Sequence, residues 1–157
     1  MITFVSEIPM VRESSVKTRT CTPQDVVDTC KDIRDSSQEM FLVLDLDSKH
    51  YLIERRMISL GIANASLVHP REVFRGAIAN GASFIICVHN HPSGDPTPSD
   101  EDLKISRQLV GAGKIIGIRV LDSVIVGRKS DDHRDMISLL DDGLVDFLVK
   151  TKRRRLK

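Results

Sequence analysis

The segment from Ser83 to Asp102 constrains the fold of this chain more than any other part of the sequence. It opens with Ser83 to Val88, a short apolar run rich in β-branched residues, which predicts a buried strand. A loop containing three prolines follows over residues 92–98, and Ser99 then offers an N-cap for a helix beginning at Asp100. This order predicts a strand–loop–helix unit whose stiff loop returns the chain to the end of the strand.

The rest of the chain alternates irregularly between short strand and helix patterns. Asp47-Ser48-Lys49 is a plausible turn of a hairpin, whereas Thr22-Pro23 and His69-Pro70 resemble helix starts. We expect the second of these helices to bury Val73, Phe74, Ala77 and Ile78, and Gly111 to Gly113 to end the helix that follows Ser99. The expected strands are 40–46, 51–58, 83–88, 115–120 and 123–126, and the expected helices are 23–36, 69–80, 100–110 and 136–149. This order favours an α/β (α+β) fold, a mixed β-sheet flanked by helices, over a doubly wound parallel sheet.

The length of 157 residues suits one domain with a real core. We expect an N-terminal arm or edge strand over residues 1–21, the domain itself over 22–127, and a C-terminal extension with a basic tail over 128–157. The expected loop or short strand at Gly61 to Ser66 lies inside that domain.

The overall charge gives no argument for nucleic-acid binding, because 23 basic and 22 acidic residues leave a net charge of +1. The tail Lys152–Lys157 is the local exception, with positive charges that suit either solvent or a polyanion such as nucleic acid. Three widely spaced cysteines predict a reducing, cytoplasmic compartment without disulfides. No apolar run approaches the roughly 18 residues of a membrane span.

The chemistry of the chain is concentrated in His89, His91 and Asp102. The two histidines are two residues apart at a strand end, so their imidazoles project from the same face. The proline-rich loop can bring Asp102, in the first turn of the next helix, to the same place. Three such ligands leave a fourth tetrahedral position for water, which predicts a catalytic zinc site. The alternative is a pair of ordinary surface histidines.

Other candidate residues near this site have simpler interpretations. Cys87 shares the strand face of His89, but a small buried apolar role is more common than a fourth ligand. Asn90 points away from that face and is expected to bond locally. His50, His69 and His133 have no ligand-like neighbours and are interpreted as structural or surface residues.

The spacing His-x-His, seven residues, Ser, two residues, Asp resembles the JAMM signature of the JAB/MPN zinc metalloprotease superfamily. The string HNHPSGDPTPSDED is similar to the RadC branch, historically called DNA repair proteins. Further matches at His69-Pro70-Arg71-Glu72 and Leu121-Asp122 extend the resemblance over residues 22–127. It implies the JAB/MPN (cytidine-deaminase-like) sandwich, with Zn²⁺ at the sheet edge. Ser123 stands where the family usually has His, which we expect to alter a nearby contact.

The resemblance also implies two catalytic residues. Glu39, about fifty residues before the first histidine, matches the family's general base and acid. Glu72 is the competing candidate, although its place beside Arg71 at a helix start suggests a dipole-stabilising role. Ser99 is expected to donate a hydrogen bond to the developing oxyanion, in addition to capping its helix.

Together these expectations describe a zinc-dependent hydrolase acting on a peptide or other amide substrate. The alternative is a nucleic-acid-associated protein or nuclease that uses the basic tail. Neither the substrate nor the oligomeric state follows from the sequence, because fold and site chemistry do not fix a target.

Overall fold

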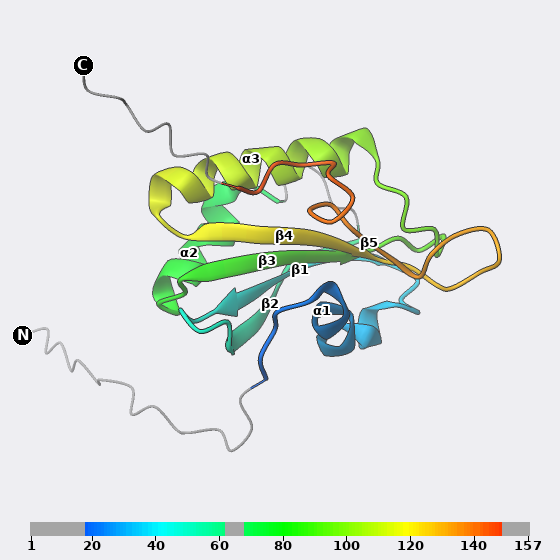
Figure 1. The fold of residues 1–157 in the computed structure, drawn as a ribbon, viewed down its shortest axis with the longest axis horizontal. Coiled ribbons are helices and arrows are strands. Elements are labelled where there is room, and N and C mark those ends of the chain that lie inside the picture. The colour runs from blue at the N-terminus through cyan, green and yellow to red at the C-terminus, as the bar shows by residue number, and fades with distance from the viewer. Residues whose placement is uncertain (1–17, 62–67, 149–157) are drawn as a thin grey trace, which may run out of the picture.

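The computed structural model describes residues 18–61 and 68–148, and these ranges build one mixed five-stranded sheet with helices on both faces (Figure 1). The arm before residue 18, the Gly61–Ser66 loop beyond Gly61 and the basic tail lie outside the described residues. The strands are β1 (Glu39–Leu46), β2 (Leu52–Gly61), β3 (Phe84–Asn90), β4 (Arg119–Val126) and β5 (Met136–Ser138). The helices are α1 (Pro23–Thr29), α2 (Pro70–Ala79) and α3 (Asp100–Ile116).

The strand order in the sheet is β2-β1-β3-β4-β5. All neighbouring strands are antiparallel except β3 and β4, which are parallel because α3 carries the chain across between them. β1 and β2 form the expected hairpin. The predicted α+β fold with a mixed sheet flanked by helices is therefore confirmed.

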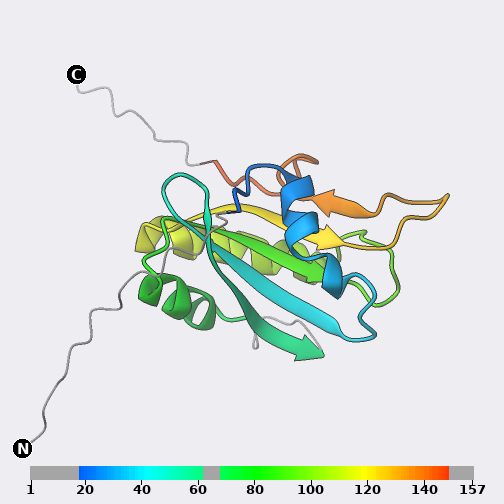
Figure 2. The ribbon, with the colours of Figure 1, turned by 90° about the horizontal axis from the view of Figure 1, so that it is seen from below.

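Two apolar layers enclose the sheet, one on each face. α2 and α3 cover one face and contribute Val73, Phe74, Ile105 and Leu109 to its core. α1 covers the other face with Val26 and Val27 (Figure 2). No helix within the described ranges is long and apolar enough to cross a membrane.

The two shorter helices begin where the sequence indicates. Thr22 caps α1 in a reciprocal capping box with Asp25, and the His69 side chain caps α2 by accepting from the Arg71 amide. α1 is shorter than the predicted 23–36, because the chain leaves helical geometry at Cys30 and continues as a 3₁₀ turn, Lys31–Ile33. In α2 the prediction for Ile78 was wrong, since that side chain is 59% exposed.

The predicted end of α3 at Gly111 to Gly113 was also wrong. The helix runs on to Ile116 and ends at Gly117, which adopts the left-handed conformation at φ 86°. A Cβ at Gly113 would press against the Ile118 carbonyl and the Phe74 ring. Gly113 therefore allows close packing within the helix instead of terminating it.

β4 is one continuous strand, whereas the sequence suggested two strands joined at Leu121-Asp122. Val120 pairs with Ile85 and Asp122 pairs with Ile86, so Leu121 is an extra residue in the ladder. Such a bulge interrupts the alternation of side chains between the two faces. Val120 and Ile125 consequently lie in the same apolar layer despite their odd spacing.

The predicted helix at 136–149 does not form over its described residues, 136–148, because residues 136–138 form β5 at the sheet edge beside β4. Buried Leu139, Val145 and Phe147 then join the layer beneath α2 and α3. Residues beyond 127 thus contribute to the same apolar core.

A buried ion pair ties β1, β2 and α2 together. The Arg56 Nε donates to Asp45 Oδ2 at 2.6 Å and its Nη2 donates to Asp45 Oδ1 at 2.8 Å. The same Nη2 donates to the Val73 carbonyl at 2.9 Å, and Asn80 donates to Asp45. Gly76 leaves room for the guanidinium, because a Cβ there would collide with it. Asp45 is fully buried, so these partners replace the hydration that its carboxylate would have in water.

We predict that Arg56→Ala lowers the free energy of unfolding by about 3–5 kcal/mol, because it leaves the Asp45 carboxylate buried without its cation. Urea denaturation followed by circular dichroism measures the change. Arg55→Ala is the matched control, since the neighbouring Arg55–Asp32 pair has the same two-bond geometry but is more exposed. Its loss is expected to cost less than about 1 kcal/mol. Equal costs for the two variants would contradict this assignment.

The reactivity of the three cysteines tests the packing of the two apolar layers. Cys30 and Cys87 are buried on opposite faces of the sheet, whereas Cys21 is exposed. Burial raises the pKa of Cys30 to about 11 and that of Cys87 to about 12. Both are therefore protonated thiols at pH 8 and weak nucleophiles. We predict that a chromogenic thiol reagent at pH 8 modifies Cys21 rapidly and the other two only after unfolding. Rapid reaction of three thiols in the native protein would contradict the described packing.

Candidate metal centre

His89 enters the site from the end of β3. It pairs with Phe41 of β1, and the two rings stack with centroids 5.7 Å apart and planes at 14°. The His89 side chain is 1% exposed, and neither ring nitrogen has a hydrogen-bond partner in the described structure. The Nε2 atom lies 3.1 Å from Asp102 Oδ1, although the two do not meet in hydrogen-bonding geometry. A buried imidazole with two unsatisfied nitrogens calls for another partner.

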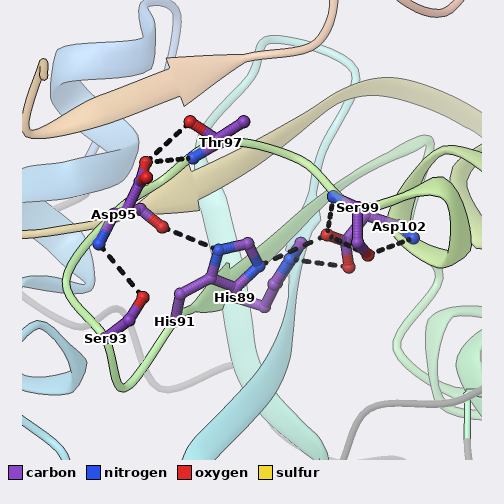
Figure 3. A network of polar contacts seen from close by, with 7 residues as sticks. All are labelled: His89, His91, Ser93, Asp95, Thr97, Ser99 and Asp102. Carbon is purple, nitrogen blue, oxygen red and sulfur yellow. Dashed lines mark hydrogen bonds and ion pairs between the residues drawn. The ribbon is translucent and has the colours of Figure 1, made fainter.

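His91 follows directly after β3 and is oriented by the proline-rich loop (Figure 3). Its Nδ1 lies 2.8 Å from the Asp95 carbonyl oxygen, which can only accept, so Nδ1 carries the proton. The opposite nitrogen, Nε2, faces Asp102 Oδ2 at 3.3 Å. The Asp95 side chain in turn accepts from the Thr97 amide and hydroxyl, which holds this part of the loop.

Asp102 is supplied by the first turn of α3. Its Oδ2 accepts from both the backbone amide and the hydroxyl of Ser99, each at 2.7 Å, while its own amide donates to Ser99 Oγ. This capping box fixes the carboxylate, which also benefits from the positive end of the helix dipole. The Ser99 hydroxyl hydrogen is engaged with Asp102 here, so its expected role as oxyanion donor requires that hydrogen to turn towards a substrate.

Glu39, the first residue of β1, completes the cluster. One ligand atom from each of Glu39, His89, His91 and Asp102 lies within 4.8 Å of the others. The Glu39 side chain is half-buried, and its negative charge contributes to raising the pKa of His91. The structure therefore brings together residues from β1, β3 and α3, although Glu39 and Asp102 are more than sixty residues apart in the sequence.

The donor set fits a zinc ion. Ligand bonds of about 2.0–2.2 Å at tetrahedral angles place neighbouring donor atoms about 3.4 Å apart. The observed separations of 3.1 Å between His89 and Asp102 and 3.3 Å between His91 and Asp102 agree with this spacing. Two imidazoles and one carboxylate are also the ligand types that catalytic zinc sites use.

The electrostatics of the cluster favour positive charge beside Asp102. Burial by itself raises the pKa of Asp102, but the imidazoles of His89 and His91 and the Ser99 amide outweigh it, and the net shift is strongly downward. The hydrogen bond with Asp102 raises the pKa of His91. Asp102 is thus an anion at neutral pH, and the cluster has a site where positive charge is favoured.

The cluster lies at one wall of an open cleft of about 450 Å³. Glu39, His91, Ser99 and Asp102 line it together with residues 92, 93, 95 and 97 of the loop. A polar, open cleft of this size admits part of an extended chain or a small molecule.

The other residues considered in the sequence lie elsewhere. Glu72 is paired with Arg71 and Arg75 at the start of α2, away from the cluster, so Glu39 is the carboxylate that the fold brings to the histidines. Cys87 is buried in the apolar layer, as its structural interpretation predicts. None of His50, His69 and His133 belongs to the described cluster.

Ser123 is the position at which the sequence departs from the family pattern. It pairs with Cys87 in the parallel β3–β4 ladder, and its buried hydroxyl has no hydrogen-bond partner among the described residues. The residue is not part of the four-residue cluster.

Two contributors to the site were not identified in the sequence. Phe41 stacks on His89, and the Asp95 carbonyl sets the tautomer of His91. The stacking follows from the β1–β3 register, which no local pattern reveals. The expectation that Asn90 bonds locally was wrong, since its side chain reaches the backbone of residues 38 and 40.

The sequence of this chain is similar to those of known proteins. The RadC-like JAB domain matches residues 20–144. A UPF0758 protein of Caldanaerobacter subterraneus subsp. tengcongensis is 51% identical over 126 residues, which cover 80% of this chain and 52% of that protein. A UPF0758 protein of Methanosarcina acetivorans is 43% identical over 130 residues, covering 82% and 55% respectively. The chain thus spans about half the length of these relatives. With 125 matched residues out of 157, and with a mixed sheet of the expected kind, this chain belongs to the RadC-like JAB domain family.

Proposed function

We propose that this chain is a zinc-dependent hydrolase that cleaves an amide bond at a JAMM-type site. The observation that supports this most directly is the convergence of Glu39, His89, His91 and Asp102, in which the Nε2 atom of the buried His89 faces the Asp102 carboxylate without a hydrogen bond from any described residue. A purely structural histidine would be expected to satisfy that atom within the protein.

In this proposal His89, His91 and Asp102 hold zinc and leave one position open to solvent. When bound, zinc supplies Lewis-acid activation of water and of the scissile carbonyl. The choice of zinc rests on the two imidazole nitrogens, because Mg²⁺ and Ca²⁺ sites are built almost entirely from oxygen ligands.

Glu39 is assigned the proton transfers. Its carboxylate is half-buried beside the open side of the cluster, where it accepts a proton from the attacking water and returns it to the leaving amine. Ser99 holds Asp102 through its amide and hydroxyl, and the hydroxyl is also a candidate donor to an oxyanion in the cleft.

The proposed substrate is a peptide or another amide whose chain enters the open cleft. The alternative partner, a nucleic acid bound by Lys152–Lys157, depends on residues outside the described ranges. The names of the relatives state no substrate, so the amide assignment rests on the resemblance of the site residues to the JAMM signature.

We predict one zinc per chain in protein purified without a metal-affinity tag, measured by elemental analysis. His91→Ala is expected to abolish stoichiometric zinc, whereas Glu39→Gln retains it because Glu39 acts on water rather than as one of the three ligands. His133→Ala is the control, since that half-buried histidine is not part of the cluster. Zinc at a hundredfold excess over its Kd adds about 2.7 kcal/mol to the stability and raises Tm. Wild-type protein that takes up no zinc, even after addition, would overturn the proposal.

We also predict that Glu39→Gln lowers amide hydrolysis by about 10²–10⁴-fold while zinc remains bound, because it removes the proton acceptor. The measurement is a screen of peptide and isopeptide substrates with zinc-loaded protein, with Glu72→Gln as the matched control. Glu72 carries the same side chain outside the cluster, so its variant is expected to keep full activity.

Deletion of residues 151–157 separates the two functional hypotheses. The hydrolase proposal predicts unchanged amide cleavage without the tail. Loss of nucleic-acid affinity on deletion, with a steep salt dependence and no cleavage of any amide by the full chain, would favour the alternative.

A further inference from the structure

We propose that Asn90 is a positioning residue that places Glu39 against the metal centre. Its side-chain amide bonds to the backbone on both sides of Glu39, so one side chain connects the proposed base to the histidines. This inference rests on the proposed function, because it assigns Asn90 a purpose only if Glu39 acts beside a metal.

The contacts of Asn90 are specific at both ends. Its Oδ1 accepts from the Met40 amide at 2.8 Å, and its Nδ2 donates to the Gln38 carbonyl at 3.1 Å. Glu39 is the residue between these two backbone groups. The orientation of the amide is determined, since an N–H must meet the oxygen and a carbonyl must meet the NH₂ group.

The regular strand pairing ends just before this point. β1 and β3 are paired from Leu46 and Phe84 up to Phe41 and His89, and Glu39 lies two residues further out. Beyond this last pair, the hydrogen bonds between the two strands are made by the Asn90 side chain instead of by the backbone. The link between the start of β1 and the end of β3 is therefore made by a side chain that is fully buried.

Asn90 also lies between the two proposed histidine ligands. Because His89 and His91 are its chain neighbours, any movement of the Asn90 backbone moves them too. A rigid side chain at this position thus holds the base at a constant distance from the ligands, which is what a preorganised site requires. Ala lacks both polar ends and Asp lacks the donor. Leu fills the volume but leaves the Met40 N–H without Asn90 Oδ1 and the Gln38 carbonyl with the Ser36 hydroxyl alone.

The test is a double-mutant cycle on zinc affinity, measured by competition with a chromogenic chelator for wild type, Glu39→Gln, Asn90→Ala and the double variant. Removing the Glu39 charge near a cation is expected to weaken zinc binding about tenfold. If Asn90 positions that charge, the same substitution in the Asn90→Ala background weakens binding less than about twofold. A full tenfold effect in both backgrounds would overturn the inference, because Asn90 would then act on the ligands or on stability alone.

Asn80→Ala is the matched control for general loosening. Asn80 also makes polar contacts between elements, but it binds Asp45 and Glu54 far from the cluster. Its variant is expected to leave the tenfold effect of Glu39→Gln intact. Asn90→Leu replaces Asn90→Ala in the cycle if the smaller side chain prevents folding, and the same two outcomes apply.

Amide hydrogen exchange in the wild-type protein tests the contact without any substitution. The Met40 amide is expected to be protected by Asn90 Oδ1, and exchange at the rate of a free peptide would overturn the inference. Failure of the proposed function is distinguishable: absence of zinc binding by the wild type overturns both, whereas tight binding with additive effects overturns only the role of Asn90.

Discussion

The pairing of β1 with β3 is the constraint on which the site depends. Phe41 lies opposite His89, so the start of β1 and the end of β3 lie side by side at the same end of the sheet. This antiparallel register brings Glu39 next to the histidines although about fifty residues separate them in sequence. A slip of one residue would turn Phe41 and Glu39 to the opposite face, because side chains alternate along a strand.

At that end of the sheet, the fold holds a buried negative charge and a buried imidazole that a bound cation would pair with. Asp102 is 6% exposed and ionised, supported by the capping box and the N-terminus of α3. The buried His89 ring makes no hydrogen bond to any described residue, although its Nε2 faces Asp102 Oδ1 at 3.1 Å. A buried unsatisfied polar group costs on the order of 1–3 kcal/mol. Functional sites are where proteins tolerate such local costs, and the two apolar layers and the Asp45–Arg56 pair supply stability elsewhere.

Much of this arrangement could be predicted from local patterns. The hairpin, β3, the start of α3 and the grouping of His89, His91 and Asp102 all depend on residues close together in sequence. The position of Glu39 was anticipated through family resemblance rather than from periodicity. The bulge at Leu121, the strand β5 and the contacts of Asn90 escaped prediction because each is determined by a partner strand. Local propensity carries no information about such partners.

The error over α3 has the same origin and bears on the site. Glycine has low helix propensity, so Gly111 and Gly113 together predict the end of a helix. In the fold, Gly113 lets the helix approach Ile118 and Phe74 more closely than any side chain would permit. α3 spans 17 residues, with this close contact near one end and Asp102 at the other. Because a helix is stiff over that length, packing at Gly113 helps to set the axis along which Asp102 reaches His89. Gly113, which the local pattern wrongly predicted to end the helix, thus helps to position the Asp102 carboxylate.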